Sequence, residues 1–108
     1  MVRADPKDVE SAAVLAELYL TQDELEVAEQ WIDRGLSIVP ANAHLQVLKG
    51  DIMSRRGLED EAIDAFEIAR EDPDWRTVAQ QRIWQLRPPE TEEEKLKRAF
   101  FGDDGMEQ

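Results

Sequence analysis

Apolar residues along this chain return every three or four positions, and no stretch alternates strictly between apolar and polar residues. Spacing of three and four places side chains on one face of an α-helix, whereas strict alternation marks a strand. Ala12, Ala16 and Leu20 belong to one such stripe, and Ala28 and Ile32 belong to the next. The pattern predicts an all-α chain with helices over about 9–20, 25–36, 43–56, 59–71 and 76–87.

Residues suited to helix ends stand at the expected boundaries. Asp23, with Glu26 three residues later, forms a capping-box sequence at the start of the second helix, and Asn42 is placed to cap the third. Gly57 supplies the left-handed residue that commonly follows a helix. Asp74 stands where it can cap the fifth helix. We therefore expect side-chain caps at the second, third and fifth helix starts.

The sequence also repeats internally. Pro6, Pro40 and Pro73 lie 34 and 33 residues apart. A shift of 34 residues places small residues on small ones and large apolar residues on large ones. The matched pairs are Ala16 with Gly50, Tyr19 with Met53, Ala28 with Ala62, Ile32 with Phe66, and Gly35 with Ala69. A fixed period of this length is typical of stacked helical hairpins.

These positions resemble the tetratricopeptide repeat family, whose 34-residue helix–turn–helix unit carries small residues, an aromatic and a closing proline. The matching residues are Leu15, Ala16, Tyr19, Ala28 and Pro40 in the first unit and Gly50, Gly57, Asp60, Glu61, Ala62, Ile63, Phe66 and Ala69 in the second. The early Trp of the family is absent, with Ala12 and Gln46 in its place. The resemblance spans about residues 9–86 and implies a right-handed array of two repeats and a capping helix.

The resemblance divides the chain into five segments. The first is either a native start, with Asp5 as a cap and Pro6 as the first helical residue, or the end of a preceding repeat in a longer array. In order, the segments are the N-terminal segment 1–8, a first repeat 9–42, a second repeat 43–75, a capping helix 76–87 and an acidic C-terminal tail 88–108.

The tail contains one further helix signal. Thr91 and Glu94 form a capping-box sequence ahead of Leu96 and Phe100, which predicts a short amphipathic helix. We expect this helix to dock on the capping helix or to fray, because a helix of this length is marginal alone. Alternatively, Leu96, Phe100 and Phe101 form a motif for a partner or enter a groove, including that of a neighbouring copy. Residues 103–108 are expected to be disordered.

Charge and composition exclude several classes of partner. The 108 residues include 25 acidic and 13 basic side chains, for a formal net charge of −12, which disfavours nucleic acid and anionic membranes. There is no Cys, and no apolar run is long enough to span a bilayer, so a cytoplasmic setting is expected. Nine Arg against four Lys, among so many acids, also fits a chain adapted to a salt-rich cytoplasm.

Candidate chemistry is sparse. His44 is the single histidine, and the acidic clusters fall at helix starts, where capping and the helix dipole account for them. No nucleophile motif or metal-ligand spacing occurs, so we expect no enzyme activity, no metal and no cofactor.

Binding is the expected function, because in the family the first helix of each repeat lines a concave surface that holds peptides. The resemblance implies that Glu10, Glu17, Leu20, His44, Leu48, Asp51, Arg55 and Trp84 contact a partner. Trp84 has a second interpretation, packing at the helix edge or under the tail. The family's clamp for a C-terminal carboxylate needs Lys and Asn, but Ala13, Glu17 and Leu48 occupy those places. A basic or amphipathic segment is therefore expected instead of an acidic chaperone tail.

Two functions remain open at this point. The first is a non-catalytic protein- or peptide-binding scaffold or co-chaperone-like module, favoured as a monomer. The alternative is a regulatory or self-association domain belonging to a larger enzyme or to a secretion or assembly protein.

Overall fold

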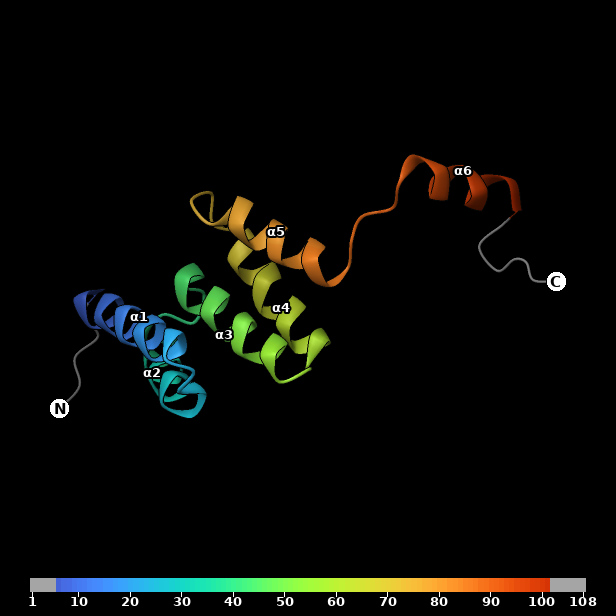
Figure 1. The fold of residues 1–108 in the computed structure, drawn as a ribbon. Helices are drawn as coiled ribbons and strands as arrows, with labels where there is room; N and C mark the ends of the chain where they lie inside the picture. Colours follow the sequence, from blue (N-terminus) through green and yellow to red (C-terminus); the bar gives the residue numbers. More distant parts are fainter. Residues whose placement is uncertain (1–5, 102–108) are drawn as a thin grey trace.

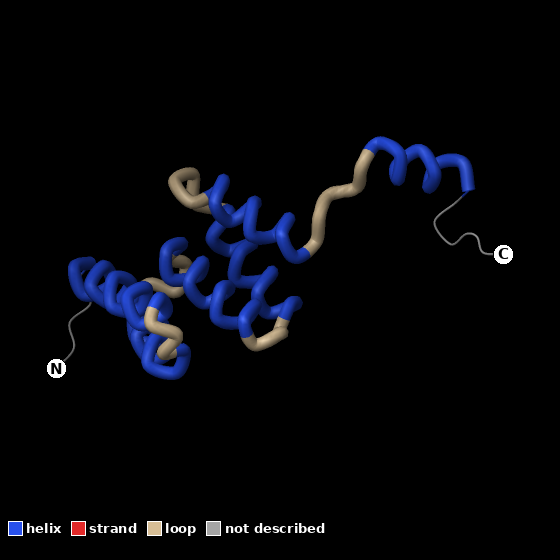
Figure 2. Tube along the Cα trace, viewed as in Figure 1, coloured by secondary structure: helices blue, strands red, loops and turns tan. Residues whose placement is uncertain are grey.

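The computed structural model describes residues 6–101, which fold into helices joined by short turns (Figures 1 and 2). The helices are α1 (Pro6–Thr21), α2 (Leu25–Ile38), α3 (Ala43–Arg55), α4 (Glu59–Arg70), α5 (Arg76–Leu86) and α6 (Glu92–Phe101). No strand occurs in this range, as the apolar spacing predicted. None of these helices combines the length and the apolar character that crossing a membrane requires.

Helices that follow one another in the chain pack together. The closest partners are α1 with α2, α3 with α4, and α4 with α5, while α3 also contacts α1 and α2 (Figure 1). The core runs along these contacts and is lined by small and large apolar residues. Its most buried large side chains are Phe66, Ile32, Leu45 and Ile52.

Burial repeats at the 34-residue interval. Ala28 and Ala62 are both fully buried. Ile32 is also fully buried, and Phe66 is only 1% exposed. Close approach of the paired helices depends on a small residue at Gly50. An ideal Cβ on Gly50 would lie 2.6 Å from Cζ of Phe66, which is too close for any real contact. The aromatic ring of α4 therefore occupies the volume that a larger residue of α3 would need.

The turn after α1 differs from the prediction, because Asp23 does not cap α2. Asp23 has a φ of +63°, and its N–H donates to the carbonyl of Leu20 at 3.0 Å. The N–H of Glu24 donates to the carbonyl of Tyr19 at 2.9 Å. These bonds form a Schellman motif that ends α1. Helix α2 then starts at Leu25 after Glu24, which makes no side-chain cap hydrogen bond, so the expected capping box is wrong.

The turn after α3 is the same motif, 34 positions later. Gly57 has a φ of +78°, and its N–H donates to the carbonyl of Ser54 at 3.0 Å. The N–H of Leu58 donates to the carbonyl of Met53 at 2.9 Å. The backbone angles of Leu58, φ −94° and ψ 75°, match those of Glu24, φ −91° and ψ 73°. The left-handed role expected of Gly57 is confirmed.

Other helix ends agree with the sequence in part. Asn42 Oδ1 accepts a hydrogen bond from the N–H of Leu45 at 2.9 Å, which confirms the cap of α3. Asp74 does not cap α5, because its own N–H donates to the side chain of Asp72 at 2.8 Å and α5 begins after Trp75. The N–H groups of Asp74 and Trp75 both donate to Asp72, so residues 72–75 form a turn before α5.

The chain ends depart from the expected boundaries. Helix α1 already begins at Pro6, before the apolar stripe, while the proposed cap Asp5 and the tail 103–108 lie outside the described residues. The capping box of α6 is confirmed, since the N–H of Thr91 donates to Glu94 Oε1 at 2.9 Å and the N–H of Glu94 donates to Thr91 Oγ1 at 3.1 Å. However, α6 does not dock on α5, and it extends away from the other helices with every residue exposed (Figure 1).

Candidate functional site

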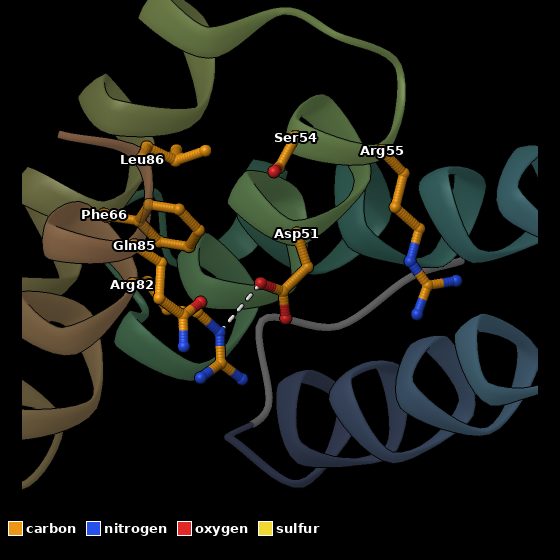
Figure 3. A pocket seen from close by; sticks show the side chains of 7 residues that line it. All are labelled: Asp51, Ser54, Arg55, Phe66, Arg82, Gln85 and Leu86. Carbon is orange, nitrogen blue, oxygen red and sulfur yellow. Dashed lines mark hydrogen bonds and ion pairs between the residues drawn. The ribbon is translucent and has the colours of Figure 1, made fainter.

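A groove runs between α1, α3 and α5, and we call it the inner groove. It contains two neighbouring hollows of about 240 and 260 Å³. The first hollow is lined by Glu17, Leu20, Thr21, His44, Val47, Leu48, Asp51, Arg55, Trp75, Val78 and Arg82. The second is lined by Asp51, Ser54, Arg55, Phe66, Arg82, Gln85 and Leu86 (Figure 3). Because the hollows share Asp51, Arg55 and Arg82, they form one continuous surface.

Helical spacing brings these residues to one side of each helix. On α3, His44, Leu48, Asp51 and Arg55 follow one another at intervals of four, three and four. Residues with this spacing lie on one face of a helix. The same α3 packs against α4 through its opposite side, where Gly50 meets Phe66. One face of α3 therefore serves the core while the other is the central wall of the groove.

The end of the groove beside α1 is organised around His44. Its Nε2 lies 3.0 Å from Glu17 Oε1, at hydrogen-bond distance. Its ring also stacks on Trp75, with centroids 4.6 Å apart and planes inclined by 17°. The histidine thus connects α3 to α1 through the carboxylate and to the start of α5 through the indole.

An ion pair crosses the middle of the groove. Arg82 Nε on α5 donates to Asp51 Oδ1 on α3 at 3.0 Å, and both side chains are partly shielded from water (Figure 3). Arg55 Nη1 donates to the carbonyl of Leu20 at 3.2 Å and lies 3.4 Å from Asp23 Oδ1. The Asp51–Arg82 pair connects α3 to α5, and the hydrogen bond from Arg55 to Leu20 connects α3 to α1.

The floor of the groove is apolar. Leu20, Val47 and Leu48 are almost fully buried, while Trp75 and Val78 are partly exposed at its side. Because the fold already covers Leu20, Val47 and Leu48, the apolar area that a partner could still remove from water lies mainly on Trp75 and Val78.

The charge of the groove is balanced, unlike that of the chain. Glu17 and Asp51 each have a partner within the molecule, and Arg55 and Arg82 contribute two positive charges. The acidic residues are concentrated instead on α4, where Glu59, Asp60, Glu61, Asp64 and Glu67 are exposed. The negative net charge therefore does not describe the candidate site.

Two of these α4 carboxylates hold the end of α5. Arg87 Nε donates to Glu59 Oε2 at 2.9 Å, and Arg87 Nη2 donates to Asp60 Oδ1. The hydrogen bond to Glu59, and to a lesser extent the one to Asp60, raises the pKa of Arg87 above its ordinary value. The pairs are solvent-exposed, so they orient the chain after α5 more than they stabilise the fold.

Six of the eight residues that were expected to contact a partner line the inner groove. They are Glu17, Leu20, His44, Leu48, Asp51 and Arg55. Glu10 instead lines a separate depression on α1. Trp84 is 47% exposed on α5, outside both groove linings, and α6 does not cover it. Packing of Trp84 under the tail is therefore wrong.

Groove residues that the sequence analysis missed include Trp75, just before α5, and Val78, Arg82 and Gln85 on α5. The 34-residue interval could have located the three residues on this helix. Counting 34 positions onward from His44, Leu48 and Asp51 reaches Val78, Arg82 and Gln85. All three line the groove. The sequence analysis ended the repeat pattern at Pro73, so it did not extend the pattern to the α5 side of the groove.

Within residues 6–101, no group of three or more His, Asp or Glu side chains is placed to hold a metal ion. In the groove, His44 is hydrogen-bonded to Glu17 and Arg82 to Asp51, an arrangement suited to recognition. Comparisons with family models, with curated proteins and with solved structures give no match for this chain. Its function is therefore inferred from the inner groove itself.

Proposed function

We propose that the chain is a non-catalytic protein- or peptide-binding module of the tetratricopeptide repeat type, in which the inner groove holds the partner. The proposed array consists of repeats 9–42 and 43–75 with a capping helix at 76–87. Support comes from the two matching Schellman turns, 34 residues apart at Asp23 and Gly57. The equal burial of Ile32 and Phe66 at the same interval also supports it.

The observation that carries the binding proposal is the convergence of residues from three helices on one groove. Leu20 comes from α1, Leu48 from α3 and Val78 from α5, and together they give an apolar surface bordered by paired charges. An apolar floor with a few oriented polar groups is the usual composition of a recognition site. The proposed role is that of a scaffold or co-chaperone-like module.

The chemistry of the groove favours an amphipathic partner segment. Its apolar side chains would cover Leu48 and Val78, while its polar side chains would bond to the groove edges. A purely basic peptide fits less well, because His44 and Arg82 already stand beside Glu17 and Asp51. The partner would gain from apolar contact with the partly exposed Trp75 and Val78 and from hydrogen bonds to the charged side chains of the groove.

The test is selection of binding peptides from a displayed random library, followed by affinity measurements on variants. We expect Glu17→Lys and Asp51→Lys to weaken binding at least tenfold, since each reverses a charge inside the groove. The matched control is Glu67→Lys, which makes the same change on the exposed side of α4. Equal affinity of all three variants and the wild-type chain would exclude the groove as the binding surface.

Self-association is a second candidate function, within a regulatory or assembly domain of a larger protein. The specific observation in its favour is α6, whose Leu96, Phe100 and Phe101 are 57%, 80% and 70% exposed. Sedimentation of the chain over a range of concentrations tests it. A mass that stays at 12.4 kDa throughout would rule it out.

A further inference from the structure

The second half of α6 carries a different charge from the rest of the chain. Residues 95–101 contain Lys95, Lys97 and Arg98 and no acidic side chain, although the whole chain has a net charge of −12. Leu96 and Phe100 are four residues apart and therefore share a face of the helix, flanked by these bases. Residues 95–101 thus form an exposed, basic and amphipathic surface.

The bases of this surface take part in ion pairs, and Arg98 Nη2 lies 2.9 Å from Glu90 Oε1, just before the helix. Lys95 Nζ lies 3.7 Å from Glu92 Oε2, and Lys97 Nζ lies 3.6 Å from Glu93 Oε2, with all four side chains largely exposed. Exposed pairs of this kind contribute little to stability. Both lysines can therefore turn toward a carboxylate on another surface at small cost.

A complementary surface lies on α1. Val14 and Leu18 are 63% and 50% exposed, and their spacing of four places them on one face. Glu10 lies one turn before Val14, and Glu17 lies beside Leu18. Residues 8–21 contain three acidic side chains and no basic one. A depression of about 550 Å³ borders this face and includes Glu10 and Val14 in its lining.

We propose that residues 95–101 of one copy pack on the outer face of α1 in a second copy. Leu96 and Phe100 would cover Val14 and Leu18, so that apolar area exposed on both helices is removed from water. Lys95 and Lys97, whose ion pairs are long and exposed, would then lie near the acids of α1, while Arg98 keeps its pair with Glu90. The inference rests on the second proposed function, self-association, and its apolar contact through Val14 and Leu18 uses no lining residue of the inner groove.

The geometry of the chain after α5 points to a second copy instead of the same chain. Arg87 is held by Glu59 and Asp60 at the start of α4, and Pro88 and Pro89 follow it directly. Consecutive prolines favour an extended backbone. The end of α5 and the outer helix α1 lie on opposite sides of the molecule, and α6 extends further away (Figure 1). The five residues 87–91 reach at most about 18 Å.

Each copy would then offer one donor helix and one acceptor face. The two surfaces differ, so the contact is heterologous, and copies pair by reciprocal exchange or join head to tail. Two variants separate the roles. Leu96→Asp with Phe100→Asp removes the donor, whereas Val14→Asp with Leu18→Asp removes the acceptor.

The experiment is sedimentation velocity on each variant and on an equimolar mixture of the two. We expect the wild-type mass to rise above 12.4 kDa with concentration, and each double variant to remain at 12.4 kDa. The mixture should give a complex of about twice that mass, since one intact donor and one intact acceptor remain. Ile68→Asp, at a 42% exposed position on α4, is the matched control and should associate like the wild-type chain.

Three results would overturn the inference in distinguishable ways. A wild-type chain that is monomeric at millimolar concentration removes both this contact and self-association. Association of the wild-type chain without complementation in the mixture removes this contact alone. The third result uses Val14→Cys with Phe100→Cys in one chain, which is otherwise free of Cys. A disulfide formed within single chains would place α6 on its own α1.

If circular dichroism shows that the acceptor variant is unfolded, Val14→Ser with Leu18→Ser replaces it. Mixing of the single variants Val14→Cys and Phe100→Cys gives an independent readout. A disulfide between the two under oxidising conditions supports the contact, and its failure to form while the wild-type chain associates contradicts it.

Discussion

Replacement of Gly50 by Ala tests the close packing of α3 against α4. A Cβ at this position would lie 2.6 Å from Cζ and 2.7 Å from Cδ1 of Phe66. The ring is only 1% exposed and is packed among the core side chains, so a shift away from the new methyl group would disturb those contacts. We expect Gly50→Ala to destabilise the protein, although Ala is normally the better residue inside a helix.

The magnitude follows from two opposing contributions. Overpacking a core by a methyl group costs about 1–3 kcal/mol. Replacing Gly by Ala in a helix interior returns about 0.5–1 kcal/mol. The net loss should be about 1–2 kcal/mol, which corresponds to a melting temperature lower by roughly 5–15 °C in a domain of this size.

A double-mutant cycle with Phe66→Leu isolates the contact. In the Phe66→Leu background the ring atoms nearest Gly50 are gone, so Gly50→Ala should be neutral or stabilise by up to about 1 kcal/mol. Chemical denaturation of the four proteins measures the coupling. The control is Gly57→Ala, where a φ of +78° causes strain but nothing lies near the new methyl group. If Gly50→Ala changes stability equally in both backgrounds, the steric explanation is wrong.

The remaining predictions concern helix ends and charge. Asp23→Gly should raise stability by about 0.5–1 kcal/mol because it relieves a left-handed conformation at φ +63°, and a lower denaturation midpoint would contradict this. Asn42→Ala should cost about 1 kcal/mol through loss of its cap, measured in the same way, and an unchanged midpoint would count against the cap. Thr91→Ala with Glu94→Ala should reduce the helical circular dichroism signal of dilute protein while its melting temperature stays constant, since α6 extends away from the other helices. Molar salt should raise the melting temperature by screening a net charge of −12, whereas a fold indifferent to salt or weakened by it would argue against salt adaptation.

The helices themselves could be predicted because their apolar stripes are long and regular. Asn42 and Gly57 were also predicted correctly, since a side-chain cap and a left-handed glycine depend on residues close in sequence. Asp23 was assigned wrongly, because Asp is common both at helix starts and, less often, in the left-handed region. Its position 34 residues before Gly57 distinguishes the two roles.

The inner groove was predicted on two of its three sides. Residues of α1 and α3 were expected there because the resemblance to tetratricopeptide repeats places the first helix of each repeat on the concave surface. The wall from α5 was not, because contacts such as Asp51 with Arg82 join residues far apart in sequence and depend on how α5 docks. The exposure of Trp84 depends on the same docking angle and on α6 extending away from α5.

The most direct test of the central claim is nuclear magnetic resonance on the isotope-labelled protein during titration with a peptide selected from a displayed library. Binding in the inner groove predicts that the largest changes in backbone amide shift cluster near Leu20, Leu48 and Val78. Amides near Asp64 and Glu67, on the exposed side of α4, should remain unchanged. Shifts centred on α4, or scattered evenly over the molecule, would contradict the assignment of the groove as the binding surface.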